Sequence, residues 1–348
     1  MLPRFVRFAD QGQAEDTPLS CLDCQRRVMM AKTKLIKVMK SNFTRSERDM
    51  TITRTGHRYR DTVSGKTLDV WYPRNGERIA RHCPAEKLGL IEGDFVTITM
   101  SPPDVSPAST EEVYLRLHLL SELAFRPNTL NLEHAFSLLN NVAWTSAGPV
   151  LPGRVLELRA RLQGEAHHLQ VSSIDKFPRL TDYVIPEGVR IADADRVRLG
   201  AHLAPGTTVM HEGFVNFNAG TLGESMVEGR ITPGVIVGRN SDVGAGASIM
   251  GTLSGGGKQV NSVGERSLIG ANAGIGISLG DECIVEAGLY VTAGSKVRTP
   301  EGKIVKAQEL SGRSGLLFRR NSQSGAIECV YTNGERWGGL NTELHGNC

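Results

Sequence analysis

An aliphatic residue returns at every sixth position along much of the second half of the chain, and a small residue usually follows it. Neither an α-helix nor a plain strand repeats its side chains with a period of six. A chain that turns a corner after each short strand brings every sixth side chain into a central stack and places the small residue at the tight corner. The registers run through Ile191, Val197, Leu203, Val209 and Val215, then Ile231, Val237, Val243 and Ile249, then Val263, Ile269 and Ile275, and finally Leu279, Val285, Val291 and Val297. The pattern predicts a left-handed parallel β-helix.

The breaks in this period are as informative as the period itself. The spacing falls from six residues to four between Val215 and Ala219 and again between Ile275 and Leu279. A longer interruption covers residues 251–262. Excursions from a rigid repeating wall are where sites are normally placed. We therefore expect functional residues beside the slips and a mobile arm at 251–262.

The chain before the repeats has mixed α/β patterning. Strands are expected at 67–72, 94–100, 155–162 and 168–174, and two helices between 109 and 141, the first starting near Thr110 with two acidic residues in its first turn. The division expected is a leader over 1–50, an α/β N-terminal domain over 51–185, the β-helix over 186–300 and a C-terminal tail over 301–348. The fold class is mainly β with an α/β N-terminal domain.

Composition excludes several classes. Aromatic residues make up 5% of the chain and glycine reaches 39 residues, which suits a solenoid filled by aliphatic side chains. A net charge of +3 does not indicate a nucleic-acid partner. There is no run of eighteen apolar residues and no signal-peptide core, so we expect no membrane partner and a cytoplasmic location.

Two weak motifs carry no assignment. Cys21 and Cys24 form a single CxxC, which is at best half of a zinc site. The glycine-rich stretch ending at Lys258 lacks the spacing of a phosphate-binding loop, and the segment 274–280 misses the dinucleotide pattern by one position. Nucleotide hydrolysis and NAD binding are not expected.

Three longer blocks carry a resemblance. They are HEGFVNFNAGTLGESMVEGR from His211, SDVGAGASIMGTLSGGG from Ser241 and LIGANAGIGISLGDECIVEAGLYVTAGSKV from Leu268. With them the chain resembles the tetrahydrodipicolinate N-succinyltransferases, in their long actinobacterial form. The resemblance implies transfer of a succinyl group from succinyl-CoA to the amine of L-2-amino-6-oxopimelate, the ring-opened substrate, in diaminopimelate and lysine biosynthesis. It also implies a homotrimer with active sites between adjacent coils.

The chemistry implied by this resemblance needs a base and a carboxylate-binding cation. A protonated amine is not a nucleophile, so a base must take a proton as the nitrogen attacks the thioester, and Glu228 matches the family position of the catalytic carboxylate. That position is interpreted either as a general base or as a nucleophile forming an acyl anhydride; we favour the base, because an anhydride beside water is easily hydrolysed. Arg230 matches a ligand-binding position and offers a bidentate grip on a carboxylate.

Further positions match the succinyl-CoA site of the family. They are Ala245, Ser248, Ala271, Glu286, Ala287, Gly294, Lys306, Arg319, Arg320, Asn321 and Ser322. Small residues there admit a pantetheine arm, although corner packing explains them equally well. Ala245 departs from the glycine expected in the family. Lys306 and the two arginines are expected to meet the CoA phosphates.

Asp195 and Glu212 match positions that bind Mg²⁺ near the threefold axis of the family trimer. Carboxylates repeated around an axis repel one another unless a cation or protons relieve them, so the implied cofactor is physically reasonable. Two acids seventeen residues apart are equally compatible with an exposed surface. His211 is expected to contribute to the same region.

Two other functional classes stay open. One is another CoA-dependent hexapeptide acyltransferase, with an acetyl donor and a sugar or amino acid as acceptor. The other is a β-helix that transfers no acyl group, either a zinc enzyme or a scaffold. The coil contains only His202 and His211, which disfavours a zinc enzyme built on a histidine cluster.

Overall fold

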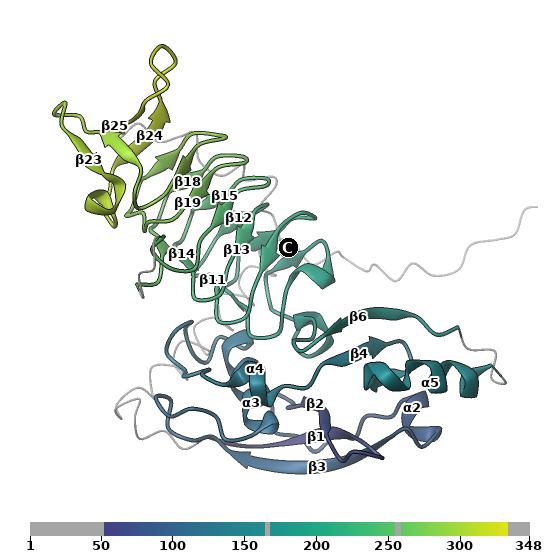
Figure 1. The fold of residues 1–348 in the computed structure, drawn as a ribbon. Helices are drawn as coiled ribbons and strands as arrows, with labels where there is room; N and C mark the ends of the chain where they lie inside the picture. Colours follow the sequence, from purple (N-terminus) through teal and green to yellow (C-terminus); the bar gives the residue numbers. More distant parts are fainter. Residues whose placement is uncertain (1–51, 164–167, 255–258, 333–348) are drawn as a thin grey trace, which may run out of the picture. The chain divides into compact units, whose positions relative to one another are not determined.

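The fold is taken from a computed structural model that describes residues 52–163, 168–254 and 259–332 (Figure 1). The expected leader over 1–50, with its CxxC, lies outside the described residues, and so do the end of the tail and the tip of the 251–262 interruption. No described helix is long and apolar enough to cross a membrane.

In the described part of the chain, two small antiparallel sheets and four α-helices precede the repeats. The first sheet has the order β2-β1-β3 and the second β5-β4-β6. The strands are β1 (Thr53–Asp61), β2 (Thr67–Trp71), β3 (Ile91–Thr99), β4 (Val142–Thr145), β5 (Gly148–Val150) and β6 (Val171–Asp175). The helices are α2 (Pro84–Lys87), α3 (Thr110–Ser121), α4 (Ala135–Leu138) and α5 (Val155–Leu162). The strands predicted at 67–72, 94–100 and 168–174 and the helix start at Thr110 are confirmed, whereas the second predicted helix is reduced to the single turn of α4.

The strand predicted at 155–162 is wrong, because this segment is helix α5. Its apolar residues alternate, but only Leu158 and Leu162 are buried, four positions apart, while Leu156 is exposed. Glu157 forms an ion pair with Arg161 across one helical turn, at 2.5 Å. Helix-favouring residue types and this pairing outweigh the alternation.

Helix α3 joins the N-terminal part to the first coil. Its N-cap is Ser109, whose hydroxyl accepts the Glu112 N–H at 3.2 Å. At its other end, the Ser121 hydroxyl accepts the backbone N–H of Gly200 at 2.8 Å, and the following carbonyl of Phe125 lies 2.9 Å from Nδ1 of His202. His202 therefore has a structural role at this junction.

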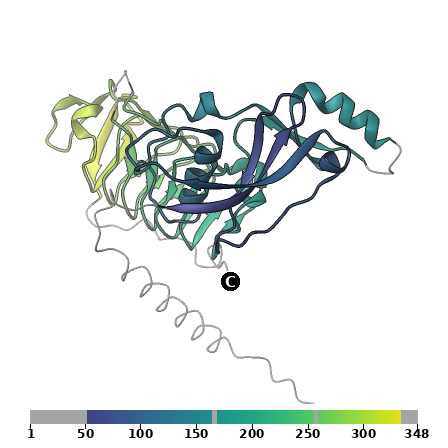
Figure 2. The same cartoon turned by 90° about the horizontal axis from the view of Figure 1, so that it is seen from below.

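The repeats form a parallel β-helix with three walls (Figures 1 and 2). One wall stacks β8 (His202–Leu203), β11 (Gly220–Thr221), β14 (Ile236–Val237) and β17 (Ser262–Val263). The second stacks β10 (Phe214–Val215), β13 (Arg230–Ile231), β16 (Ser248–Ile249), β19 (Gly274–Ile275) and β21 (Tyr290–Val291). The third runs through β7 (Arg190–Ile191), β9 (Thr207–Val209), β12 (Ser225–Val227), β15 (Asp242–Val243), β18 (Leu268–Ile269) and β20 (Ile284–Val285). Every predicted hexapeptide position except the partly buried Ile191 is at most 3% exposed, which confirms the aliphatic stack.

The coil lengths locate the register slips. Residues paired on successive coils are separated in the sequence by three full hexapeptides where the period is regular, as Arg230 and Ser248 are. Phe214 and Arg230 are paired at a separation that is two residues shorter. Leu203 pairs with Thr221 and Val209 with Val227, both again at the full spacing. The predicted slip between Val215 and Ala219 is therefore wrong, because the coil is shortened at the corner between Val227 and Ile231.

The other two irregularities lie where the period predicts them. Val263 pairs with Leu279 at the same shortened spacing, so the second slip falls between Ile275 and Leu279. Ser248 pairs with Gly274 at a spacing well beyond three hexapeptides, because the interruption lengthens that coil. The described base of the interruption is held by an antiparallel bridge between Thr252 and Val260.

Glycine has two different roles at the corners of the coil: close packing against the next coil, and a backbone with positive φ. A Cβ on Gly244, which directly follows an inward valine, would lie 2.8 Å from the backbone nitrogen of Ala271 on the next coil. This position is therefore small because neighbouring coils touch there. The positive φ needed for the turn occurs two residues later, at Gly246 (68°), and at equivalent corners it is adopted by Asn240 and Asn272.

The chain after the coil folds back onto the third wall. It contains β22 (Lys296–Arg298), β23 (Ile304–Lys306), β24 (Leu316–Arg320) and β25 (Ile327–Tyr331). β24 pairs in parallel with β20, so that Val285 is opposite Phe318, and antiparallel with β25. The tail thus extends the third wall beyond its last hexapeptide strand.

The inward stack predicts a matched pair of stability effects. Ile249→Ala leaves a cavity at a fully buried position and should lower the free energy of unfolding by about 2–5 kcal/mol. Ile304→Ala, at a side chain that is 65% exposed, should change it by less than about 0.5 kcal/mol. Chemical denaturation of both variants measures the difference, and equal losses would contradict the stack.

Candidate functional site

The outward residues of the second wall form a ladder. Phe214, Arg230, Ser248, Gly274 and Tyr290 are direct Cα partners on successive strands, while the residue after each points into the core. Because strands in a sheet are about 4.8 Å apart, side chains on neighbouring rungs are in contact distance. Residues far apart in sequence are thus presented side by side on one face.

A groove of about 620 Å³ lies along this ladder. It is lined by Arg196, Glu212, Phe214, Glu228, Gly229, Arg230, Gly246, Ala247, Ser248 and Tyr290. Four predicted site residues therefore meet in one groove: Glu212, Glu228, Arg230 and Ser248. Arg196, Phe214 and Tyr290 were not predicted from the sequence.

Glu228 lies in the shortened corner of the coil. Three residues separate the inward Val227 and Ile231, where an ordinary hexapeptide has five. Its backbone N–H donates to the carbonyl of Val243 at 2.8 Å. A Cβ on the neighbouring Gly229 would lie 2.5 Å from the carbonyl oxygen of Ala247, so this corner packs closely on the next coil. The main chain at Glu228 is fixed, and its partly exposed carboxylate lines the groove.

Arg230 is exposed in the groove and is oriented by its neighbour on the ladder. Its Nη2 and Nε donate to the hydroxyl of Ser248 at 2.8 and 3.3 Å. Among the described residues it forms no ion pair with a carboxylate, so its charge is available to an anionic ligand. Arg196 adds a second positive charge, with a long 3.9 Å contact to Asp193.

Asp242 is a carboxylate next to this corner that the sequence analysis missed. It accepts the backbone N–H of Met226 at 2.8 Å. Burial raises the pKa of Asp242 to about 6, against the effect of that hydrogen bond, and the charge of Glu228 raises it further. Asp242 does not line the groove, but its charge and that of Glu228 repel one another at the shortened corner.

The predicted alanines stack at one corner of the coil. The carbonyl of Ala245 accepts the N–H of Asn272, and the carbonyl of Ala271 accepts the N–H of Gly288, both at 2.8 Å. Ala287 follows on the next coil, where its nitrogen would be 2.6 Å from a Cβ on Gly270. The three alanines thus form a stripe from the groove toward the tail.

At the tail, Glu286 accepts the backbone N–H of Arg320 at 2.7 Å, and Arg319 forms an ion pair with Glu328 at 2.9 Å. Asn321 accepts the N–H groups of Gln323 and Ser324 and so shapes the turn between β24 and β25. None of the predicted residues Ala245, Ala271, Glu286, Ala287, Gly294, Lys306, Arg319, Arg320, Asn321 and Ser322 lines the groove. In one chain the predicted site is therefore divided between groove and tail.

Of the two predicted metal ligands, only Glu212 lines the groove. Asp195 is 55% exposed and contacts Arg179 at 3.4 Å. No group of three or more histidine, cysteine, aspartate or glutamate side chains suited to a metal occurs in the described ranges.

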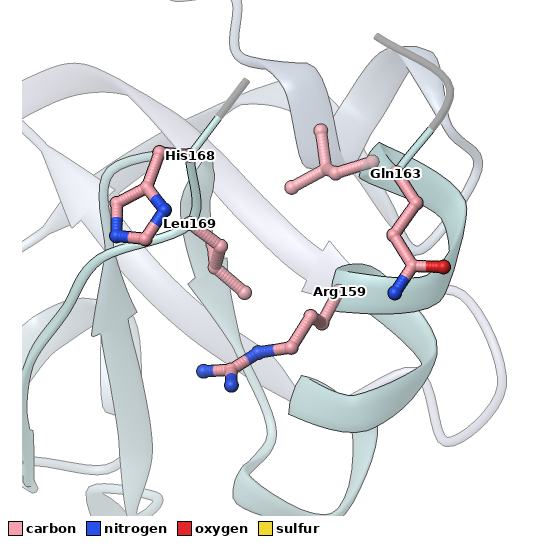
Figure 3. Close-up of a pocket in the computed structure, with 5 residues that line it drawn as sticks. Arg159, Gln163, His168 and Leu169 are labelled. Carbon is pink, nitrogen blue, oxygen red and sulfur yellow. The ribbon is translucent and has the colours of Figure 1, made fainter. Parts of the chain in front are cut away.

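A second cavity, of about 430 Å³, lies in the N-terminal part (Figure 3). Arg159, Leu162 and Gln163 border it from the end of α5, and His168 and Leu169 from the segment before β6. None of the predicted site residues lines it.

Family models match two parts of the chain. The description "hexapeptide repeat of succinyl-transferase" fits residues 224–250 and 260–293, and "tetrahydrodipicolinate N-succinyltransferase middle" fits residues 139–179. Together with the observed coil and groove, these matches place the chain in the class of hexapeptide-repeat transferases.

Curated relatives are similar over most of their length. The 2,3,4,5-tetrahydropyridine-2,6-dicarboxylate N-succinyltransferases of Pseudomonas aeruginosa and Pseudomonas paraeruginosa are each 60% identical over 238 residues, 66% of this chain and 69% of theirs. That of Vibrio cholerae is 54% identical over 270 residues, 76% of this chain and 77% of its own. The chain belongs to the tetrahydrodipicolinate N-succinyltransferase family. Its placement in the actinobacterial form stays a prediction.

A solved structure supports the same assignment. A putative 2,3,4,5-tetrahydropyridine-2-carboxylate N-succinyltransferase from Campylobacter jejuni is 30% identical, with a TM-score of 0.71, covering 87% of this chain and 98% of that chain.

The raised pKa of Asp242 predicts a pH-dependent stability difference. The wild-type carboxyl has a pKa of about 6 when folded but ionises near its ordinary 3.8 when unfolded, so the stability cost of its charge develops as the pH rises from 3.8 to 6 and is complete above pH 6. Asp242→Asn should raise the free energy of unfolding by about 2–3 kcal/mol at pH 8 and by almost nothing below pH 4. Denaturant titrations at both pH values test this. A gain of equal size at both would show that the charge is not responsible.

Proposed function

We propose that the protein transfers the succinyl group of succinyl-CoA to the amine of L-2-amino-6-oxopimelate, the ring-opened form of tetrahydrodipicolinate. The products are N-succinyl-2-amino-6-oxopimelate and CoA. Family membership supports the reaction, and the meeting of Glu228 with Arg230 and Ser248 in one groove is the observation that carries the site.

Glu228 is the general base of this proposal. The amine nitrogen attacks the thioester carbonyl, a nitrogen–carbon bond forms, and the Glu228 carboxylate takes the proton that the nitrogen loses. The tetrahedral intermediate then collapses, the carbon–sulfur bond breaks, and the proton held by Glu228 passes to the leaving thiolate, which releases CoA as its thiol and restores the carboxylate. The carboxylate is partly exposed in the groove, and its main chain is fixed by the shortened corner, so it is accessible and positioned. Direct attack needs no acyl anhydride on the protein.

Arg230 and Arg196 supply the positive charge that this chemistry requires. The acceptor is a dicarboxylate and the acyl group carries a third carboxylate, whereas Glu228 is itself negative. A guanidinium forms two parallel hydrogen bonds with a carboxylate, and the hydroxyl of Ser248 sets the orientation of Arg230.

CoA is proposed to follow the stripe of Ala245, Ala271 and Ala287 toward the tail. The pantetheine arm is narrow and extended, which suits small side chains along a wall. Glu286 fixes the main chain at Arg320, and Arg319, Lys306 and Gly294 are assigned with Asn321 and Ser322 to the end that holds the phosphates.

The coil is proposed to be left-handed and the protein to be a cytoplasmic homotrimer. Flat walls pack readily around a threefold axis, and a groove completed by a neighbouring coil would bring a second subunit's tail to it. The domain division at residues 50, 185 and 300 is proposed unchanged from the sequence.

Mg²⁺ at the trimer axis is the remaining proposal taken from the sequence. The carboxylates of Asp195 and Glu212 are ligands of the right type, but one chain supplies too few oxygens for the six that Mg²⁺ prefers, and Asp195 already contacts Arg179. The residues of a single chain do not fit the ion, so the site requires equivalent side chains from all three subunits. No step of the reaction depends on it here.

Removing the proposed base predicts a large loss of rate. Glu228→Gln keeps the side-chain size but cannot take the proton, and should lower kcat about 100- to 10,000-fold. Thiol release from succinyl-CoA is measured with and without tetrahydrodipicolinate, and with acetyl-CoA in parallel. Glu224→Gln, the same change at an exposed position outside the groove, is the control. Wild-type rates in Glu228→Gln would refute the assignment, and a preference for acetyl-CoA would favour a different acyltransferase.

The metal proposal predicts a change in the trimer. Chelation should lower the melting temperature of wild-type protein, because the repelling carboxylates lose their counter-charge, and Mg²⁺ should restore it. An Asp195→Asn and Glu212→Gln double variant should be insensitive to chelation. Elemental analysis that finds no Mg²⁺ in the purified trimer would rule the site out.

A further inference from the structure

The ladder contains one rung without a side chain, and a tyrosine ring covers it. Gly274 lies between Ser248 and Tyr290 as a direct Cα partner of each. A Cβ on Gly274 would lie 2.1 Å from Cε1, 2.3 Å from Cζ and 2.5 Å from Cδ1 of Tyr290. Real Cβ atoms do not approach a ring so closely. The ring therefore occupies the space that any other residue at position 274 would need.

The geometry also gives the direction in which the ring points. The Tyr290 backbone is one strand beyond Gly274, yet Cε1 and Cζ are the atoms nearest to the Gly274 position. Since Cζ carries the hydroxyl, the hydroxyl end of the ring lies over the Gly274 rung, between the backbones of Tyr290 and Ser248. This explains why Tyr290 lines the groove together with Arg230 although their backbones are three strands, about 14 Å, apart.

Arg230, Ser248 and Tyr290 line the same groove, and each carries a hydrogen-bond donor. Arg230 donates to the oxygen of Ser248, which leaves the Ser248 hydroxyl hydrogen free to donate elsewhere. The Tyr290 hydroxyl has no hydrogen-bond partner among the described residues, and the side chain is 49% exposed. A guanidinium and two hydroxyl donors along one groove are suited to binding a carboxylate.

We propose that Tyr290 is a specificity-determining residue, whose ring closes the groove at Gly274 and whose hydroxyl donates a hydrogen bond to a carboxylate of the bound dicarboxylate substrate. The proposal rests on the groove being the site of acyl transfer. The carboxylate belongs either to the succinyl group of the donor or to the acceptor, and both present the same chemistry to the hydroxyl.

The test is Tyr290→Phe, which keeps the ring and removes the hydroxyl. Affinities for succinyl-CoA and for butyryl-CoA, a four-carbon donor without the terminal carboxylate, are measured by titration calorimetry, and KM is measured for tetrahydrodipicolinate. Loss of a hydrogen bond to a charged group should weaken one carboxylate ligand about 10- to 100-fold. A loss for succinyl-CoA but not butyryl-CoA identifies the donor, and a raised KM for the acceptor alone identifies the acceptor. Unchanged values, or equal losses for both thioesters, would overturn the proposal.

Gly274→Ala provides an independent variant, because the added methyl group must displace the ring. It should shift the same ligand in the same direction, and in the Tyr290→Phe background it should add little, as expected for two changes to one interaction. Tyr331→Phe, the same substitution at an exposed tyrosine outside the groove, is the matched control. If Glu228→Gln retains full activity, the groove itself is misassigned. If Glu228→Gln loses activity but the Tyr290 and Gly274 variants keep wild-type affinities and KM, only the proposal for Tyr290 fails.

Discussion

The structure depends on the in-register stacking of short parallel strands around an aliphatic core. A side chain on a strand points to the opposite face from its neighbour, so a shift of one residue would exchange core and surface along a whole wall. Wherever a coil is shorter or longer than three hexapeptides, the difference is therefore located at a corner and not within a strand. The shortened coil after Phe214, the ordinary coil after Arg230 and the extended coil after Ser248 all preserve the pairing of the second wall.

Much of this was predictable because the core contains little besides aliphatic residues. The hexapeptide positions were identified from sequence alone, and all but one of them are buried. The first slip was misplaced because Thr221 occupies an inward position and interrupts the aliphatic pattern. Its hydroxyl is 2.6 Å from that of Thr207, so the polar group is satisfied inside the core. In α5 the alternation of leucines hid a helix that local ion pairs support.

The site was predictable only in part. The resemblance to a family indicated Glu228 and Arg230, and these residues do meet in one groove. Tyr290 was missed because its proximity to the other groove residues depends on coil length, and Asp242 was missed because its proximity to Glu228 does so too. Which residue lies beside another on the next coil changes with every corner that is shortened or extended. A local sequence motif therefore does not show which residues are neighbours on successive coils.

The tail strand β24 has a consequence for how the chain can be shortened. The last hexapeptide strand of the third wall would otherwise present a row of unpaired N–H and C=O groups, and β24 covers it by pairing Ile284 with Leu317. Exposed strand edges recruit other chains. The segment after the coil therefore acts as an end cap against fibre-like association. A chain ending near residue 300 would leave the edge of β20 unpaired and open to pairing with a strand of another chain.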